Sequence, residues 1–213
     1  MQILSNLFNK KKEKPKKIVS FDGGGVRVIA GIVFLKKLEV ESGKKISDIF
    51  DMFVGTSAGA FNAACLAHGE MSADELKRYW SKDYLDRIME TSFFWDQASL
   101  IQARPRYETK GRVKVLQEIF GNTTLGDSRK PLVTICYDIE ERSHVIHSSD
   151  ITPNITYIDA VCASSAAPMY FPTYQMENGS WMIDGGVVTN NPTLIGFNHA
   201  KKFFNTNNIK VLS

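Results

Sequence analysis

The fold of this chain is decided by the stretch Val54-Gly55-Thr56-Ser57-Ala58-Gly59-Ala60, which puts a serine between two glycines. An apolar, strand-like run over residues 49–54 comes before it, and small residues over 58–67 favour a helix after it. A serine on a sharp strand-to-helix turn projects out of the backbone, and only glycines tolerate the crowding beside it. The pattern therefore predicts a nucleophilic Ser57 at a helix N-terminus, and the competing interpretation is a tight glycine turn in an ordinary α/β unit.

The composition is that of one globular domain: 213 residues, 43% hydrophobic and 23% charged. Cys65, Cys136 and Cys162 are odd in number, widely spaced and set in apolar stretches, which argues against a disulfide framework or a metal site. No apolar run approaches the ~20 residues that cross a bilayer, and no secretory signal is recognisable. We expect a cytoplasmic or peripheral-membrane protein.

A basic tail, residues 1–16, precedes the domain that we predict over residues 17–213. Residues 1–17 contain six lysines and one glutamate, and subtracting this +5 from the total of +3 leaves −2 for the rest. Apolar residues 3, 4, 7 and 8 fall on one helical face before the lysines. Residues 3–17 could therefore contact an anionic membrane; the alternatives are a solubilising leader or a patch resembling a nuclear-import signal. The body has no face typical of nucleic-acid binding.

Hydrophobic periodicity predicts alternating strands and helices. Strands are expected at residues 17–21, 49–54, 131–137, 144–147, 181–183 and 209–212, and helices at 29–40, 58–67, 73–89, 110–120, 158–163 and 192–204. Repeated strand–helix–strand units favour a parallel sheet with right-handed crossovers. Residues 91–108 are aromatic without clean periodicity, which suits either a wall over an apolar site or a folded loop.

A serine hydroxyl needs a base. The chain has four histidines, and none follows a strand in a loop, where a catalytic histidine is normally presented. Asp184 is better placed, because it ends a short strand and Gly185 and Gly186 allow the backbone to turn sharply. A triad of Ser57, Asp184 and His199 has the chain order of an α/β-hydrolase and stays open as an alternative.

Three consecutive glycines, Gly23, Gly24 and Gly25, follow the first strand and precede a helix. Their unobstructed amides suit an oxyanion hole. The alternative is a phosphate-binding loop, but Val28 stands where the dinucleotide fingerprint requires a glycine, and the P-loop ending is absent.

The sequence resembles the patatin-like phospholipase family over about residues 16–213. The resemblance rests on four motifs in order: residues 22–27 (DGGGVR), residues 55–59 (GTSAG), residues 163–168 (ASSAAP) with 170–171 (YF), and residues 184–186 (DGG) with 190–192 (NNP).

The resemblance implies a three-layer α/β/α fold, a mostly parallel sheet flanked by helices that is related to the α/β-hydrolase arrangement. It also implies a lipid acyl hydrolase without metal or organic cofactor, acting on a phospholipid or other acyl ester. Ser57 would be the nucleophile and Asp184 its proton acceptor, a dyad without histidine. Gly24 and Gly25 would supply oxyanion amides next to Gly23, with Arg27 beside them. The nucleophile elbow would be framed by Gly55 and Gly59.

Two departures from the family pattern stand out. Val28 replaces the usual glycine after the loop arginine, which would crowd the loop or stiffen the helix start. The chain stops at Ser213, where the family normally continues, so a short or truncated domain is expected. Both favour the remaining alternative, an inactive relative that binds lipid or a partner.

Overall fold

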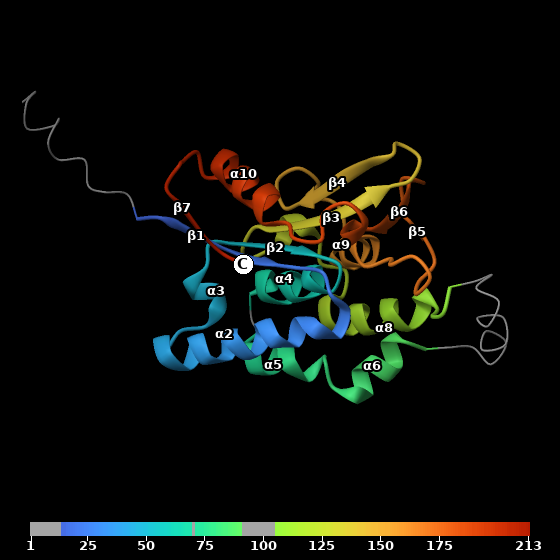
Figure 1. Ribbon diagram of the computed structural model, residues 1–213, viewed down its shortest axis with the longest axis horizontal. Coiled ribbons are helices and arrows are strands. Elements are labelled where there is room, and N and C mark those ends of the chain that lie inside the picture. The colour runs from blue at the N-terminus through green and yellow to red at the C-terminus, as the bar shows by residue number, and fades with distance from the viewer. Residues whose placement is uncertain (1–13, 70, 91–104) are drawn as a thin grey trace, which may run out of the picture.

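The computed structural model describes residues 14–69, 71–90 and 105–213, which are organised around a seven-stranded mixed sheet (Figure 1). The strands are β1 (Lys16–Phe21), β2 (Met52–Thr56), β3 (Leu132–Asp138), β4 (Ser143–Ser148), β5 (Tyr174–Gln175), β6 (Trp181–Asp184) and β7 (Ile209–Leu212). Their order is β5-β6-β3-β2-β1-β7, and β4 also pairs with β3.

The sheet has a parallel part and an antiparallel part. β7, β1, β2 and β3 pair in parallel, as predicted. β4 and β6 pair antiparallel with β3, and β5 pairs antiparallel with β6, so the sheet is mixed rather than mostly parallel. Short connections account for the β3–β4 and β5–β6 pairings, because a few residues can join antiparallel neighbours only, whereas a parallel crossover needs a dozen or more.

Helices cover both faces of the sheet, which confirms the predicted α/β class (Figure 1). The helices are α2 (Ile29–Ser42), α3 (Ile46–Ile49), α4 (Ala58–His68), α5 (Ala73–Arg78), α6 (Lys82–Ile88), α8 (Thr109–Phe120), α9 (Tyr157–Ser164) and α10 (Thr193–Phe203), with short 3-10 turns η1 (Gly25–Val28), η2 (Leu125–Asp127) and η3 (Gly185–Val187). Helix α10 covers one face of the sheet. Helices α4 and α9 cover the other face, and α2, α5 and α8 pack on the outer side of these two helices (Figure 1).

The alternation along the strands divides the core in two. In β1, Ile18 packs with Ala200 of α10, while Val19 packs on the opposite face among the helices around α4. Helix α4 is rich in small residues and is buried along nearly its whole length, and it lies close against β1, β2 and β3. The close packing places the N-terminus of α4 at the carboxyl ends of the parallel strands.

The strand before the serine begins later than predicted. Ile49 ends the short helix α3, and β2 starts at Met52, so the prediction of a strand over residues 49–54 was wrong at its start. Asp51 is the reason, because it exchanges two hydrogen bonds with the backbone of Lys17 at the start of β1. Its carboxylate accepts a hydrogen bond from the Lys17 amide (2.8 Å), and its own amide donates to the Lys17 carbonyl (2.7 Å).

The helix predicted over residues 73–89 is two helices, α5 and α6. A capping box of Ser72 and Glu75 begins α5. The amides of residues 79–81 then bond three residues back, which tightens and ends the helix. The Trp80 indole donates to Asn62 Oδ1 on α4 (2.9 Å) and anchors this break.

The other predicted elements agree with the structure to within two residues at their ends. The membrane-contact prediction concerns residues 3–17, of which residues 3–13 lie outside the described ranges. Residues 91–104 of the aromatic segment also lie outside them. Within the described ranges, no helix combines the length and the apolar character needed to span a membrane.

Candidate active site

Ser57 lies on a strained turn between β2 and α4. Its φ of 58° and ψ of −128° are unusual for a residue with a side chain. A Cβ on Gly59 would stand 2.4 Å from the Phe21 carbonyl oxygen, and one on Gly55 would stand 2.3 Å from the Gly59 carbonyl oxygen. Gly59 is therefore required for the close approach of the turn to the end of β1, and Gly55 for the tightness of the turn itself.

Asp184 is brought to Ser57 by the pairing of strand β3. One edge of β3 is occupied by β4, so β2 and β6 share the other edge. Thr56, at the end of β2, pairs with Ile135, and Asp184, at the end of β6, pairs with the next residue, Cys136. The two strands thus meet head-on, and Ser57 Oγ donates a hydrogen bond of 2.5 Å to Asp184 Oδ2.

The Asp184 carboxyl is buried, with 5% of its surface exposed. Its Oδ1 accepts a hydrogen bond from the Gly186 amide (2.7 Å), and Gly185 passes so close to β3 that a Cβ would stand 2.3 Å from the Ile135 oxygen. Burial raises the pKa of Asp184 above its usual value. The hydrogen bonds from Ser57 and Gly186 and the charge of Arg112 oppose this rise.

Ser164, at the end of α9, links the Ser57 turn to strand β3 by hydrogen bonds. Its Oγ accepts a hydrogen bond from the Ser57 amide (2.9 Å) and donates to the Ile135 carbonyl (2.6 Å). Two residues on, the Ala166 carbonyl accepts a hydrogen bond from the Asp184 amide (3.0 Å). The sequence pointed to the small-residue run over 163–168 as part of a family motif, but it assigned no role to Ser164.

The glycine loop between β1 and η1 lies beside Ser57. The Gly23 amide donates to the Asn190 carbonyl (3.0 Å), and Asn190 Nδ2 donates back to the Gly23 carbonyl (3.2 Å). A Cβ on Gly23 would meet Asn190 Oδ1 at 2.5 Å and Ser57 Cβ at 3.2 Å. Among the described residues, the amides of Gly24 and Gly25 have no hydrogen-bond partner, and both glycines line the adjoining cavity.

Arg27 and Val28 follow the glycine loop. The Arg27 side chain is exposed at the cavity and donates through Nε to the Gly24 carbonyl (3.4 Å). Val28 has φ −62° and ψ −12°, ordinary helical angles that place no demand for glycine. The backbone of the loop thus accommodates the departure from the family pattern.

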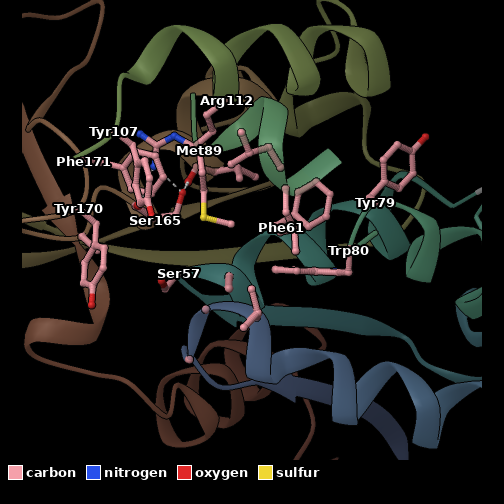
Figure 2. Close-up of a pocket in the computed structure, with 18 of the residues that line it drawn as sticks. Ser57, Phe61, Tyr79, Trp80, Met89, Tyr107, Arg112, Ser165, Tyr170 and Phe171 are labelled. Carbon is pink, nitrogen blue, oxygen red and sulfur yellow. Dashed lines mark hydrogen bonds between the residues drawn. The ribbon is translucent and has the colours of Figure 1, made fainter. Parts of the chain in front are cut away.

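A cavity of about 450 Å³ opens beside Ser57 (Figure 2). Its wall is largely apolar and runs from the glycine loop and Ser57 past Phe61 to Tyr79 and Trp80. Tyr107 and Phe171 stand at the opposite end, next to Arg112, and Tyr170 lies further from Arg112 on the same side (Figure 2). Such a cavity suits an apolar chain whose reacting end lies at Ser57.

The structure does not bring His199 to Ser57. His199 lies on α10, and its Nε2 is hydrogen-bonded to Asp150 Oδ1 (2.9 Å). His147 is buried in β4, and His68 packs against the rings of Phe120 and Tyr157. Within the part of the chain that the structure describes, no group of three or more His, Cys, Asp or Glu side chains could hold a metal ion.

Comparison with known proteins defines the class. A sequence model of the family described as patatin-like phospholipase matches residues 19–197. Patatin-like protein 4 of Arabidopsis thaliana is 35% identical, over 87% of this chain and 54% of that protein. A cGAMP-activated phospholipase of Pseudomonas aeruginosa is 30% identical, over 87% and 57% respectively. The chain belongs to the patatin-like phospholipase family, and it spans about half the length of the curated relatives it matches.

The fold comparison agrees. The crystal structure of VipD from Legionella pneumophila superposes with a TM-score of 0.56 at 17% identity, over 84% of this chain and 47% of VipD. The likeness at this identity is one of fold.

Proposed function

We propose that this chain is a lipid acyl hydrolase of the phospholipase A type, with Ser57 as nucleophile and Asp184 as general base. The observation that carries the proposal is the 2.5 Å hydrogen bond between Ser57 Oγ and Asp184 Oδ2 at the edge of an apolar cavity. Family membership supports it, as does the similarity to proteins named phospholipases. The catalytic domain would span residues 17–213, after the basic tail of residues 1–16.

The reaction follows from the geometry. Asp184 takes the Ser57 proton as Oγ attacks the acyl ester carbonyl, and the oxyanion accepts hydrogen bonds from the Gly24 and Gly25 amides. The alcohol leaves with the proton from Asp184, and an acyl-Ser57 ester remains. Asp184 then takes a proton from water, whose oxygen attacks the acyl-enzyme, and the fatty acid departs as Ser57 regains its proton. These steps require no cofactor.

The pH dependence follows from the burial of Asp184. A general base must be deprotonated, and burial raises its pKa, which makes the carboxylate more basic than an exposed one. We expect kcat/KM to fall as the pH decreases through the raised pKa of Asp184 and to level off above it. The measurement is kcat/KM for p-nitrophenyl butyrate against pH. If the acidic limb of this profile, where kcat/KM falls, lies at the pKa of an ordinary exposed carboxyl, the assignment is contradicted.

The test of the dyad is ester hydrolysis by the wild type and by Ser57→Ala and Asp184→Asn. Each substitution removes one of the two groups that exchange the proton, so we expect kcat to fall by about 10⁴-fold. His199→Ala is the matched control for the triad alternative, and full activity is expected there because His199 is bonded to Asp150. Undiminished turnover in Ser57→Ala or Asp184→Asn would refute the dyad.

A second measurement separates an enzyme from a binding module. A fluorophosphonate should label Ser57 in the folded wild type and leave Ser57→Ala unlabelled. Products from phospholipid, lysophospholipid, galactolipid and triacylglycerol would then identify the substrate. A folded chain that neither labels nor hydrolyses any of these lipids would favour the inactive, lipid-binding alternative.

A further inference from the structure

Arg112 of α8 is a cation buried in the cavity wall. Only 5% of its surface is exposed. Its Nη1 donates to the Ser165 carbonyl (2.6 Å) and to Ser165 Oγ (2.9 Å), and its guanidinium stacks 4.4 Å from the centre of the Phe171 ring (Figure 2). Within the described residues, it forms no ion pair, and its Nε and Nη2 lack hydrogen-bond partners. A buried charge without an acidic partner is costly, so its position calls for a compensating role.

The residue that Arg112 holds is the centre of a segment that contacts both members of the proposed dyad. In this site segment, residues 164–166, Ser164 Oγ accepts a hydrogen bond from the Ser57 amide, and the Ala166 carbonyl accepts one from the Asp184 amide. Arg112 binds Ser165, between these two contacts. A shift of the Arg112 guanidinium would therefore move the supports of Ser57 and Asp184 together.

Arg112 also acts on Asp184 through its charge, which lowers the pKa of that carboxyl against the effect of burial. Five other ionisable groups lie near the two: Cys136 opposite Asp184 on β3, Asp138 two residues further on β3, Asp159 and Cys162 on α9, and Tyr174 on β5, whose pKa burial raises. Burial raises the pKa of Cys136 to about 12 and that of Cys162 above its usual value, so both thiols are neutral near pH 7.

The two aspartates do not replace the cation. Asp159 is occupied by hydrogen bonds from Tyr174 Oη and Thr156 Oγ1, and Asp138 accepts from the amides of residues 140 and 141. Both are of the same sign as Asp184. Among the described residues, Arg112 is thus the cation whose field reaches the carboxylate.

We propose that Arg112 is a positioning residue, which fixes the site segment 164–166 against Ser57 and Asp184 and whose charge stabilises the Asp184 carboxylate. The inference rests on the proposed function of the dyad. It assigns a role to a residue outside the family motifs that the sequence displays.

The experiment compares Arg112→Met, Arg112→Lys and Lys114→Met with the wild type, using kcat and kcat/KM for p-nitrophenyl butyrate against pH. Lys114→Met is the matched control, because it removes the same charge from the exposed face of the same helix.

In Arg112→Met, we expect the acidic limb of kcat/KM to move to higher pH and kcat to fall by roughly ten- to a hundredfold. In Arg112→Lys, the limb should stay near its wild-type position while kcat still falls, since the charge remains and the planar guanidinium that stacks on Phe171 and places Nη1 at Ser165 is lost. Lys114→Met should leave the limb in place.

Three results would overturn the inference. A uniform loss of kcat at every pH in Arg112→Met would leave only a structural role, and a change confined to KM would indicate substrate binding instead. An equal shift of the limb in Arg112→Lys and Arg112→Met would exclude the charge as its cause. Should Arg112→Met fail to fold, Arg112→Gln, which is also neutral and keeps a donor for Ser165, carries the same test.

A titration of the Asp184 carboxyl by carbon NMR in the same variants does not depend on turnover. We expect a higher midpoint in Arg112→Met than in the wild type and an unchanged midpoint in Lys114→Met. An unmoved midpoint in Arg112→Met overturns the role of Arg112 even if the wild type hydrolyses esters. A wild type without Ser57-dependent hydrolysis refutes the proposed function separately.

Discussion

At Ser57, a single residue combines backbone strain with the position proposed for the nucleophile. Its positive φ costs of the order of 1–3 kcal/mol and persists because the surroundings hold it there. The Ser57 amide is bonded to Ser164 and its hydroxyl to Asp184, so the strained backbone is tied on both sides. The glycines at 55 and 59 make this possible by removing the side chains that would collide with neighbouring backbone.

Gly59→Ala tests this local packing. Its added Cβ would stand 2.4 Å and 2.5 Å from the carbonyl oxygens of Phe21 and Asp22, both backbone atoms that cannot move aside cheaply. We expect the free energy of unfolding, measured with urea, to fall by about 1–3 kcal/mol or more. Gly31→Ala in the exposed part of α2 is the control, because a Cβ there has nothing within 4 Å. It should raise the free energy of unfolding by about 0.5–1 kcal/mol, and a loss of equal size in both variants would contradict the packing argument.

At the level of elements, β3 is the common reference for the site. It pairs with β2 and β6 along one edge, and so determines that Ser57 and Asp184 meet. Its other edge pairs with β4, where Thr134 lies opposite His147. Both residues are buried, and within the described residues Thr134 Oγ1 and the two His147 ring nitrogens have no hydrogen-bond partner.

This buried pair predicts an acid-sensitive fold. Burial lowers the pKa of His147 from 6.5 to about 4, only partly opposed by the charge of Asp159. The unfolded chain therefore binds a proton below about pH 6.5, whereas the folded chain does so only near pH 4. Stability is full above this window and is lost as the pH falls through it, by about 3 kcal/mol in total.

His147→Leu should remove this contribution and flatten the free energy of unfolding between pH 4 and 6.5, measured by urea titration at several pH values. His144→Leu, on the exposed part of the same strand, is the matched control and should keep the wild-type slope. An unchanged slope in His147→Leu would show that another group causes the acid sensitivity.

For the whole molecule, charge is distributed unevenly. The first 17 residues carry +5, whereas the remainder of the chain carries −2. We propose that the tail adds attraction to anionic membranes, each lysine near such a surface contributing ~1 kcal/mol. The start of β1 at Lys16 limits how the tail can be tested, because Lys16 and Lys17 pair with β7.

A deletion of residues 2–13 therefore stops short of β1 and leaves its pairing intact. We expect it to weaken binding to phosphatidylserine vesicles strongly and binding to phosphatidylcholine vesicles little, as measured by co-sedimentation. A variant with glutamine at Lys10, Lys11 and Lys12 is the control that separates charge from the apolar residues 3–8. Equal vesicle binding by the wild type and the deletion variant would show that the tail does not contact the membrane and is only a leader.

The parts of the fold that were predictable are those with a local physical signal. Glycine in the sequence indicates an unusual backbone conformation at three places: around Ser57, in the glycine loop and at the Gly185 turn. The break at Trp80 was missed because its cause is a hydrogen bond to Asn62, eighteen residues earlier on another helix. Strands β4 and β6 were predicted, but their antiparallel direction was missed, because hydrophobic periodicity indicates a strand and does not record which strand it pairs with or in which direction.

By itself, the sequence determined the α/β class, the elbow at Ser57 and the presence of an aspartate on a second glycine turn, since each depends on residues adjacent in the chain. Only the tertiary structure decided that β2 and β6 meet head-on along β3, which brings Ser57 and Asp184 to hydrogen-bonding distance. It also decided that Arg112, which reads in the sequence as an ordinary helix residue, is buried against Ser165. The physical reason is that strand register and the burial of a charge are set by contacts between residues far apart in the chain, and no local pattern records them.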